Sequence, residues 1–330
     1  MLTKPEEIVS ILVCPRCRRP LLELGPAGKP GLQCSNSACE LSASPFLSVD
    51  EQPVLVDFEQ SILDAAMFRA SSGASVYKRD PGRESFMSRL RRYAFGESEI
   101  AVRLAAEFVD AVQKLSEKPR VLVIGGGEVG SGAARLYEKT SLEVIGTDIY
   151  VSPYTTLIAD GHQLPFADQS IDGVWIKAVL EHVLDPALVV AEIHRVLKPR
   201  GLVFADTPFM QQVHEGAYDF TRYTLSGHRW LFRRFKLIDA GFSSGPGTTL
   251  RWAIEYFVRF ITRSQKLASA AGLAFSWLRF FDKWPGGRLA ADSASGVFFY
   301  GERADVALRP REIIGFYETQ KALTPRGMRP

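Results

Sequence analysis

The chain has 330 residues, of which 46% are hydrophobic and 23% are charged, and its net charge is +3. These values are typical of a globular protein with one large and one small domain, and so small a charge does not by itself indicate nucleic-acid binding. No apolar run approaches the roughly 20 residues that cross a bilayer. The N-terminal residues lack the basic region and cleavage site of a signal peptide, so we expect a cytoplasmic protein.

The cysteines indicate a metal site near the N-terminus. They form two pairs, with two intervening residues in the first and four in the second: Cys14, Cys17, Cys34 and Cys39. Paired thiolates at such spacings can surround one Zn²⁺, whereas disulfides would be unusual in a chain without an export signal. We predict a zinc ribbon over residues 1–57. Its metal is expected to be structural, because no further ligand or base accompanies the thiolates and so short a segment needs metal ligation to fold.

The residues that follow the cysteines lead into the main part of the chain. Phe46–Phe58 is expected to supply the closing strands of the ribbon, with a turn at Asp50–Pro53. Residues 58–118 are expected to form a helical linker, or N-terminal cap. Apolar residues recur there at helical spacing, which predicts a helix from Glu97 to Leu115 with one buried face: Ile100, Leu104, Phe108, Val112 and Leu115. The basic run Arg89–Arg92 is read as a solvated face or a substrate contact.

From Arg120 onward, predicted strands alternate with predicted helices. The strands are expected at Val121–Ile124, Glu143–Thr147, Thr155–Ala159, Asp172–Lys177, Leu202–Asp206 and Ser295–Arg303. Helices are expected up to about Lys139, over Pro186–Leu197, in two aromatic-rich stretches within 249–285, and after Pro310. This alternation predicts the α/β class, with a parallel sheet covered by helices on both faces.

A glycine pattern follows the first of these strands. Gly125-x-Gly127-x-x-Gly130 allows a tight turn and a close approach of a ligand to the backbone. Asp148 ends the next strand, where it can accept hydrogen bonds from ribose hydroxyls. Folds that bind dinucleotides and folds that bind S-adenosylmethionine share this pattern, so the glycines alone leave the cofactor open.

The next hundred residues distinguish these cofactors. "ADGHQLPFADQSIDGVWIKAVLEHVLDP" and "AEIHRVLKPRGLVFADTPF" contain the blocks LPF…D.S.D.V, LEHV.DP and R.LKP.G. In these blocks the chain resembles class I S-adenosylmethionine-dependent methyltransferases, from about Arg120 to Phe242. A dehydrogenase would not explain them. The resemblance implies a Rossmann-like domain over 119–330, with seven strands, an antiparallel last strand and a helical insertion, 249–285, before it.

The resemblance also implies which residues hold the cofactor. The glycine loop would wrap the methionine part, Asp148 with neighbouring Ile149 would bind the ribose, and Asp160 would bind the adenine amino group. The full set is Gly125, Gly127, Gly130, Asp148, Ile149, Asp160, Gly161, His162 and Lys177, the last beneath the sulfonium. Two positions depart from the family, because Val123 stands where an acid is usual and Gly130 comes one residue late. Glu128 is expected to help hold the methionine end.

The N-terminal segment carries a second resemblance. From "ILVCPRC" to "PVLV" it is similar to the small zinc-ribbon activators of methyltransferases, here fused to the enzyme. In that family such ribbons stabilise or activate a methyltransferase and are not catalytic.

The candidate acceptor site lies in Thr207–Thr224, beyond the ends of the fourth and fifth strands. Its "PF…H…YD..RYT" pattern resembles a segment of methyltransferases of cell-surface polysaccharide and glycan synthesis. His214 could act as a general base, with Asp219 orienting it and Arg222 holding an acidic or phosphorylated substrate. Alternatively, Asp219 and Arg222 pair only to fix the loop, and His214 is a loop residue.

The insertion 249–285 combines basic and aromatic residues. It holds six basic residues against two acidic ones. We expect a lid over the substrate pocket, and as the second interpretation a peripheral contact with the inner membrane face.

Together these features predict an S-adenosylmethionine-dependent methyltransferase acting on a small-molecule, sugar or glycan-type acceptor, at oxygen. One alternative is an RNA methyltransferase with an RNA-binding ribbon, for which the basic runs Arg16–Arg19 and Arg89–Arg92 could serve, although the low charge makes nucleic acid a less expected partner. The other is a non-catalytic cofactor-binding scaffold or assembly factor. No particular protein partner is indicated.

Overall fold

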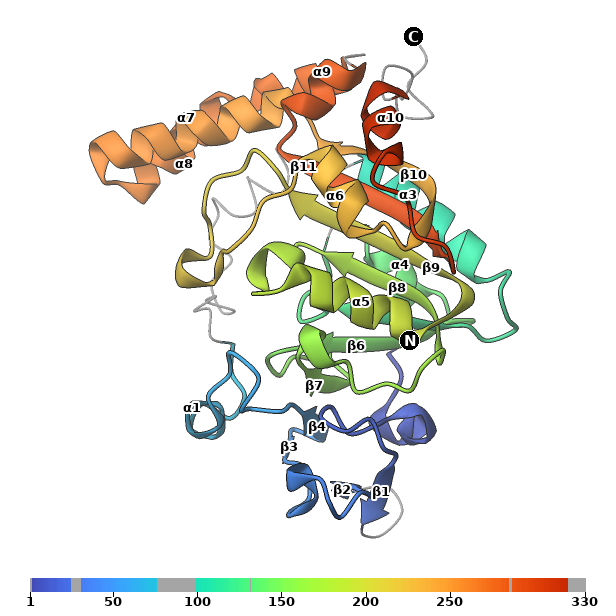
Figure 1. Ribbon diagram of the computed structural model, residues 1–330. Coiled ribbons are helices and arrows are strands. Elements are labelled where there is room, and N and C mark those ends of the chain that lie inside the picture. Colours follow the sequence, from blue (N-terminus) through green and yellow to red (C-terminus); the bar gives the residue numbers. More distant parts are fainter. Residues whose placement is uncertain (1, 25–30, 76–98, 131, 285–286, 320–330) are drawn as a thin grey trace.

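The structure is a computed structural model that describes residues 2–24, 31–75, 99–130, 132–284 and 287–319 (Figure 1). The basic run Arg89–Arg92 lies outside the described residues.

Within the described residues, a nine-stranded sheet forms the centre of the molecule, in the order β10-β11-β9-β8-β5-β6-β7-β4-β3. Its strands are β3 Ser48–Val49, β4 Gln52–Leu55, β5 Arg120–Ile124, β6 Glu143–Asp148, β7 Leu157–Ala159, β8 Ile171–Lys177, β9 Leu197–Pro208, β10 Phe235–Ser244 and β11 Gly296–Arg303. The strands from β4 to β9 pair in parallel, and β11 runs antiparallel between β9 and β10. The predicted parallel sheet with an antiparallel last strand is thus confirmed.

Residues 119–330 contribute seven strands to this sheet, β5 to β11, and the β3–β4 hairpin adds two more at its edge. β4 pairs in parallel with β7, with Leu55 opposite Ala159. The tight hairpin turn falls at Asp50 and Glu51, which both adopt positive φ, 47° and 64°, as two-residue hairpin loops require. The turn therefore lies where the sequence predicted it. The strands around it, however, close the edge of the large sheet and not the ribbon.

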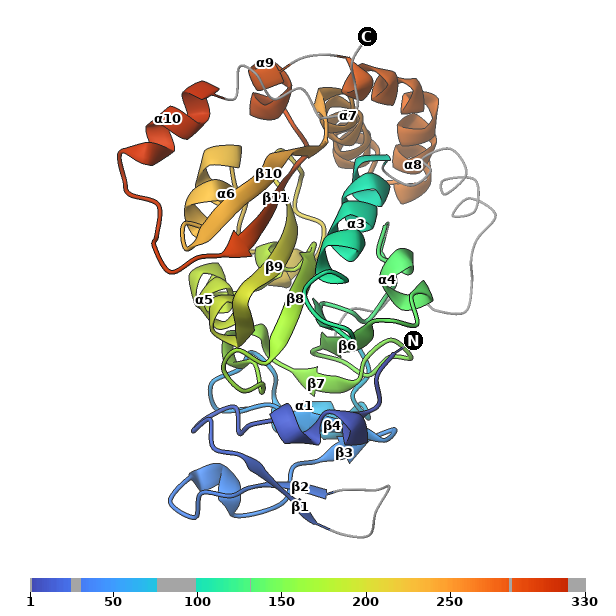
Figure 2. The ribbon, with the colours of Figure 1, turned by 90° about the vertical axis from the view of Figure 1, so that its right-hand side faces the viewer.

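Helices cover both faces of the sheet, as predicted (Figure 2). On one face lie α5 Pro186–Val196 and α6 Leu225–Leu231, and on the other lie α3 Glu99–Val112 and α4 Ala134–Glu138. The predicted apolar face of α3 is confirmed, since Ile100, Leu104, Phe108 and Val112 are all buried against the sheet. α5 begins where Asp185 accepts a hydrogen bond from the Leu188 amide (3.0 Å), with Pro186 at its first position.

The helix after the glycine pattern is much shorter than predicted. Gly132 adopts φ +84°, and a Cβ there would lie 2.7 Å from the carbonyl oxygen of Ala101. This left-handed residue keeps the chain out of helical conformation until Ala134, so α4 has only five residues. The described loop residues 125–130 therefore shape the site through their own backbone and not through a helix N-terminus.

The cysteine-containing segment packs directly on the large sheet. β1 Leu21–Leu24 and β2 Gly31–Cys34 form a separate two-stranded hairpin. Apolar residues before and within that hairpin share one hydrophobic core with the sheet, and Leu12 forms an isolated bridge with Phe166. The ribbon is thereby joined to the chain just beyond β7.

The residues between β10 and β11 form a projecting helical arm (Figures 1 and 2). It consists of α7 Pro246–Thr262, α8 Gln265–Ala274 and the 3-10 helix η7 Ser276–Lys283, followed by α9 Gly287–Asp292. α7 and α8 pack closely because Gly272 faces the buried Arg251–Glu255 ion pair, where a Cβ would lie 2.5 Å from a Glu255 oxygen. α10 Glu312–Thr319 is the short helix predicted after Pro310. Among the helices of the described residues, none combines the length and apolarity that crossing a membrane requires.

Candidate functional site

A cavity of about 320 Å³ opens at the carboxyl ends of β5 to β8. Its volume falls at the lower end of the range typical of small-molecule sites, and its position is the usual ligand site of open α/β sheets. Most of the predicted cofactor residues line it: Gly125, Gly130, Asp148, Ile149, Asp160, Gly161, His162 and Lys177. The fold thus brings together residues from four separate strand ends.

The glycine loop forms one wall of the cavity. Gly125 has φ +73°, and a Cβ on it would lie 2.2 Å from a methyl group of Val179. Gly127 does not line the cavity, but its amide donates to Asp148 Oδ2 (2.8 Å). A Cβ on Gly127 would lie 2.2 Å from the Tyr150 hydroxyl. Gly125 and Gly127 are therefore required for the loop to reach Asp148, whereas Gly130 has open space around it.

The backbone fixes the Asp148 carboxylate at the end of β6. Oδ2 accepts from the Gly127 amide, and Oδ1 accepts from the Ile149 amide at 2.7 Å. A carboxylate has about four acceptor positions, so it can accept more than these two hydrogen bonds. A pair of adjacent hydroxyls, such as those of a ribose, is the chemistry that this arrangement fits.

Asp160, beyond the end of β7, is held even more firmly. Its Oδ1 accepts from the His162 amide (2.9 Å) and contacts His162 Nδ1 (2.6 Å), while Oδ2 accepts from the Ser61 hydroxyl (2.5 Å). Burial would raise the pKa of Asp160, but the hydrogen bonds from His162 and Ser61 outweigh it and lower the pKa. Asp160 is therefore an anionic acceptor at neutral pH. The Asp185 amide donates to His162 Nε2 (3.1 Å), which fixes the ring.

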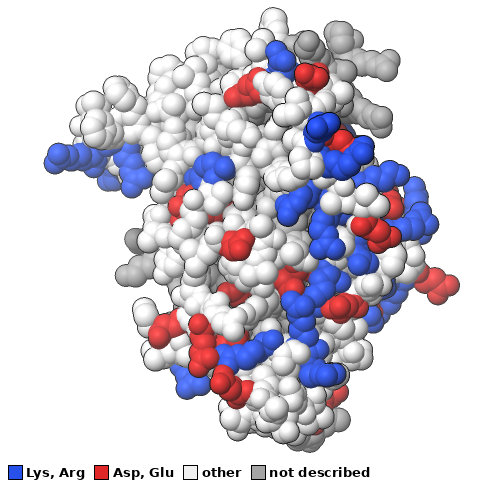
Figure 3. Space-filling view, in the orientation of Figure 1, with Lys and Arg blue, Asp and Glu red and all other residues white. Residues whose placement is uncertain are grey.

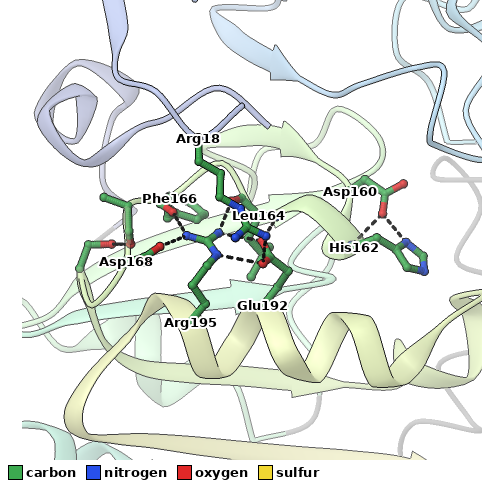
Figure 4. A network of polar contacts seen from close by, with 10 residues as sticks. Arg18, Asp160, His162, Leu164, Phe166, Asp168, Glu192 and Arg195 are labelled. Carbon is green, nitrogen blue, oxygen red and sulfur yellow. Dashed lines mark hydrogen bonds and ion pairs between the residues drawn. The ribbon is translucent and has the colours of Figure 1, made fainter. Parts of the chain in front are cut away.

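A polar network ties the chain after Asp160 to the ribbon (Figure 4). Arg18, beside Cys17, donates to Glu192 of α5 (2.9 Å), and the Leu164 amide donates to the same carboxylate (3.1 Å). Arg195 donates to the carbonyl oxygens of Leu164 (2.8 Å) and Phe166 (2.7 Å). The cysteine-containing segment thus helps to position the loop that follows Asp160, which the sequence did not reveal.

Three polar residues from beyond β8 and from the acceptor loop also line the cavity, namely His182, His214 and Glu215. The His214 amide donates to Asp219 Oδ2 (2.9 Å), and His214 Nδ1 lies 3.3 Å from the same oxygen. Of the three predicted catalytic residues, His214 alone lines the cavity. Asp219 contacts His214 but does not line the cavity.

Arg222 is bound to its own loop. It forms a two-point ion pair with Asp219, with Nη2 donating to Oδ2 at 2.8 Å, and also donates to the carbonyl oxygens of Gln211, Gln212 and Thr221. Burial would raise the pKa of Asp219, but hydrogen bonds from Arg222 and from the His214 amide lower it to about 2. These contacts favour the interpretation that Asp219 and Arg222 fix the loop.

Glu181, within the LEHV block, is a notable feature that sequence reasoning missed. Its side chain is 1% exposed, and its carboxylate oxygens have no hydrogen-bond partner among the described residues. Burial raises the pKa of Glu181 to about 8. One oxygen lies 3.6 Å from His182 Nε2, and His182 Nδ1 donates to the carbonyl oxygen of Tyr218 (2.7 Å). A strongly perturbed carboxyl directly behind a cavity is typical of a functional site.

A further residue that lines the cavity, Ile62 from the segment that follows the ribbon, was not predicted from the sequence. Ala178 adopts φ +53° at the end of β8, held by its amide's hydrogen bond to the Asp206 carbonyl oxygen (2.9 Å). Lys177 forms an ion pair with Asp206 at 3.4 Å. No residue of the described part of the insertion 249–285 lines this cavity, and the insertion reaches the acceptor loop through Tyr256, whose hydroxyl donates to the Val213 carbonyl oxygen (2.9 Å).

The four cysteines lie together below the sheet. All four Sγ atoms are within 4.8 Å of one another, with Cys14–Cys39 at 3.9 Å and Cys17–Cys34 at 3.4 Å, and none forms a disulfide. Zn–S bonds of 2.3 Å in a tetrahedron give sulfur–sulfur separations of about 3.8 Å. The thiolates therefore fit the dimensions of a tetrahedral zinc site.

Comparison with known proteins supports the class of this site. A family model described as a methyltransferase domain matches residues 81–205, which include β5 to β8 and most of the cavity. This match supports an S-adenosylmethionine-dependent methyltransferase. An uncharacterized 37.1 kDa protein of transposon TN4556 from Streptomyces fradiae is 45% identical over 51 residues. That alignment covers 16% of this chain and 15% of the relative.

Several solved structures are similar to this chain at low identity. A candidate sarcosine dimethylglycine methyltransferase from Galdieria sulphuraria is 14% identical, with 67% of this chain and 99% of that chain covered and a TM-score of 0.43. Phosphoethanolamine N-methyltransferase 2 from Haemonchus contortus is 15% identical, with 68% and 59% covered and a TM-score of 0.41. A methyltransferase from Archaeoglobus fulgidus is 13% identical, with 66% and 100% covered and a TM-score of 0.40.

Proposed function

We propose that the protein binds S-adenosylmethionine in this cavity and transfers its methyl group to a hydroxyl of a small-molecule, sugar or glycan-type acceptor. The observation that carries the proposal is the pair of fixed carboxylates, Asp148 and Asp160, on consecutive strand ends beside the glycine loop. Two anionic acceptors suit the donor groups of a nucleoside, namely ribose hydroxyls and an adenine amino group.

Each part of the cavity has a role in cofactor binding. Asp148 would hold the ribose, Asp160 with His162 would hold the adenine, and the loop from Gly125 would enclose the methionine part. When bound, the cofactor's sulfonium supplies an activated methyl group. Lys177 beneath that position would repel a cation, but its ion pair with Asp206 reduces the repulsion.

The protein's remaining task is to align the acceptor and remove its proton. His214 is the group suited to do so, because it lines the cavity from the acceptor loop. His214 Nδ1 lies 3.3 Å from both the Gln212 carbonyl oxygen and Asp219 Oδ2, so a ring that donates from Nδ1 would leave Nε2 able to accept the hydroxyl proton. Arg222 acts through Asp219, as a positioning residue. The resemblance of this loop to glycan-type methyltransferases favours a sugar hydroxyl.

We further propose that Cys14, Cys17, Cys34 and Cys39 bind one structural Zn²⁺. The sulfur separations support this site. Through the hydrogen bonds of Arg18 and the Leu164 amide to Glu192, a metal bound here would stabilise the cofactor loop without contacting the reactants. RNA binding by Arg16–Arg19 is disfavoured, because two of its three arginines already form ion pairs with carboxylates. Arg16 pairs with Asp57 (2.6 Å), and Arg18 pairs with Glu192.

Titration with S-adenosylmethionine and transfer of its tritium-labelled methyl group test the proposal. We expect calorimetry to show one cofactor site per chain, weakened in Asp148→Ala and unchanged in Asp110→Ala, which removes an exposed aspartate of α3. With a dialysed extract as acceptor source, we expect ribonuclease-resistant label. Label confined to RNA would refute the acceptor class. Cofactor binding without transfer to any fraction would favour the scaffold.

A further inference from the structure

The surface of the arm formed by α7, α8 and η7 is unusually apolar. Four of its aromatic side chains are strongly exposed: Phe257 (64%), Phe260 (78%), Phe280 (75%) and Trp284 (70%). Leu250, Ile261, Leu267, Trp277 and Phe281 are exposed on the same elements. Soluble monomers rarely expose contiguous apolar patches of this kind, and large ones mark interaction surfaces.

The exposed apolar residues of α7 lie on one face of the helix. Phe257, Phe260 and Ile261 are three and four residues apart on α7, so they lie on one face of the helix. Arg251 and Glu255 form a buried ion pair and lie against Gly272 of α8. The arm therefore has an inner side that packs and an apolar outer side that nothing in the described structure covers.

Basic residues accompany the apolar ones. Arg259, Arg263, Lys266, Arg279 and Lys283 belong to the arm or its connecting turns, and Figure 3 shows Lys and Arg gathered at its free end. The arm's two acidic residues are turned inward, because Glu255 is buried with Arg251 and Asp282 accepts hydrogen bonds from Thr248. The exposed face is thus apolar and cationic, which complements an anionic lipid surface.

The same face continues toward the acceptor end of the cavity. Tyr256 of α7 binds the Val213 carbonyl oxygen, and Val213 directly precedes His214. Met210, Val213 and Phe220, all on the acceptor loop, have exposed apolar side chains. In Figure 1 this loop, drawn in yellow around the 3-10 helix η6 Gly216–Tyr218, lies on the side of the molecule from which the arm projects.

We propose that the arm lies on an anionic membrane surface and that the methyl acceptor is a hydroxyl of a lipid-linked molecule presented at that surface. The part about the acceptor rests on the proposed function. A membrane-bound arm would bring the acceptor loop, and with it His214, to the level of the lipid headgroups. A lipid-linked acceptor could then reach the cavity without leaving the membrane.

Vesicle sedimentation with the full chain tests the membrane contact. We expect binding to phosphatidylcholine vesicles that contain phosphatidylglycerol and little binding to phosphatidylcholine alone. Each basic residue near an anionic surface contributes about fivefold in affinity, so Arg259→Glu with Arg263→Glu should weaken binding by at least about 25-fold. The matched control, Lys114→Glu with Lys139→Glu, makes the same charge change at exposed sites away from the arm and should bind like the wild type.

A second set of variants tests the apolar face without changing charge. Phe257→Ser, Phe260→Ser and Trp284→Ser together should abolish vesicle binding, whereas Met67→Ser, Val306→Ser and Ile314→Ser, at exposed sites elsewhere, should preserve it. Binding that neither arm set weakens, or no binding to either vesicle, would overturn the proposal. So would a dimer in light scattering that the apolar arm set dissociates, because a second copy would then cover this face.

The acceptor is tested separately, by partitioning the tritium label between organic solvent and water. Label in the organic phase that falls in the arm variants, while their calorimetric affinity for S-adenosylmethionine is unchanged, supports a lipid-linked acceptor. Label that stays in a water-soluble sugar or small molecule overturns the lipid-linked acceptor and leaves the proposed function intact. Failure of cofactor binding in the wild type would instead overturn the proposed function, whatever the vesicles show.

Discussion

Replacing Glu181 with Gln is expected to stabilise the protein at neutral pH. The carboxyl is buried, has no hydrogen-bond partner within the described structure, and has its pKa raised from 4.5 to about 8 by burial. Folding therefore favours its protonated form. Glu181→Gln keeps the size of the side chain and removes its titration, so only the free energy of the ionised state should change.

The magnitude follows from linkage between protonation and folding. Between pH 4.5 and about 8, the folded state binds a proton that the unfolded state has released. The contribution of Glu181 to stability is therefore fully present below pH 4.5 and decreases by about 1.36 kcal/mol for each pH unit above it. The wild-type protein should therefore be less stable at pH 7 by about 3 kcal/mol than it would be if Glu181 contributed as it does below pH 4.5. For a chain of this length, that corresponds to a difference of about 5 °C in Tm.

Thermal and urea unfolding measured from about pH 5 to about pH 8 test this expectation. The advantage of Glu181→Gln over the wild type should be small at the acidic end and should grow steadily as the pH rises. Glu192→Gln is the matched control, because Glu192 is also buried but is paired with Arg18 and Arg195. That variant should lose stability at pH 7. Parallel pH curves for the wild type and Glu181→Gln would refute the reasoning.

Three further expectations concern the cofactor, the metal and the base. Asp148→Ala should weaken S-adenosylmethionine binding by roughly 10- to 100-fold, because it removes a charged acceptor worth about 1.5–3 kcal/mol, and a calorimetric Kd equal to that of Asp110→Ala would contradict this. Cys17→Ser should reduce the zinc content measured by atomic absorption and lower the Tm, whereas Ser44→Ala, an exposed site nearby, should change neither. His214→Ala should lower kcat by about 10²- to 10⁴-fold with the cofactor Kd unchanged, and an unchanged kcat would exclude His214 as the base.

The local sequence determined much of the fold. The continuous apolar runs of β5, β6 and β8 indicated buried parallel strands, and the spacing of Ile100, Leu104 and Phe108 indicated the face of α3 that packs on them. The glycine pattern and Asp148 were placed correctly at two strand ends. Such features depend on residues close together in the chain, so they can be predicted without knowledge of the tertiary structure.

The sequence did not show what β4 pairs with. The β3–β4 hairpin was recognisable, but its attachment to β7 depends on which edge of the large sheet is free, and that follows only from the complete strand order. The place of β3 and β4 in the sheet is therefore settled by long-range pairing. The brevity of α4 was likewise missed, because the close approach of Ala101 to Gly132 is a tertiary contact.

For the site, the sequence by itself determined the residue types: a glycine loop, carboxylates at strand ends, two pairs of cysteines and a histidine-containing loop. Only the tertiary structure decided that Arg222 is bound to its own loop, that Arg18 connects the cysteines to the Asp160 loop, and that Glu181 is buried without a hydrogen-bond partner among the described residues. The physical reason is that residue chemistry is local. Burial, pairing and pKa depend instead on which groups folding brings from distant parts of the chain to within a few ångströms.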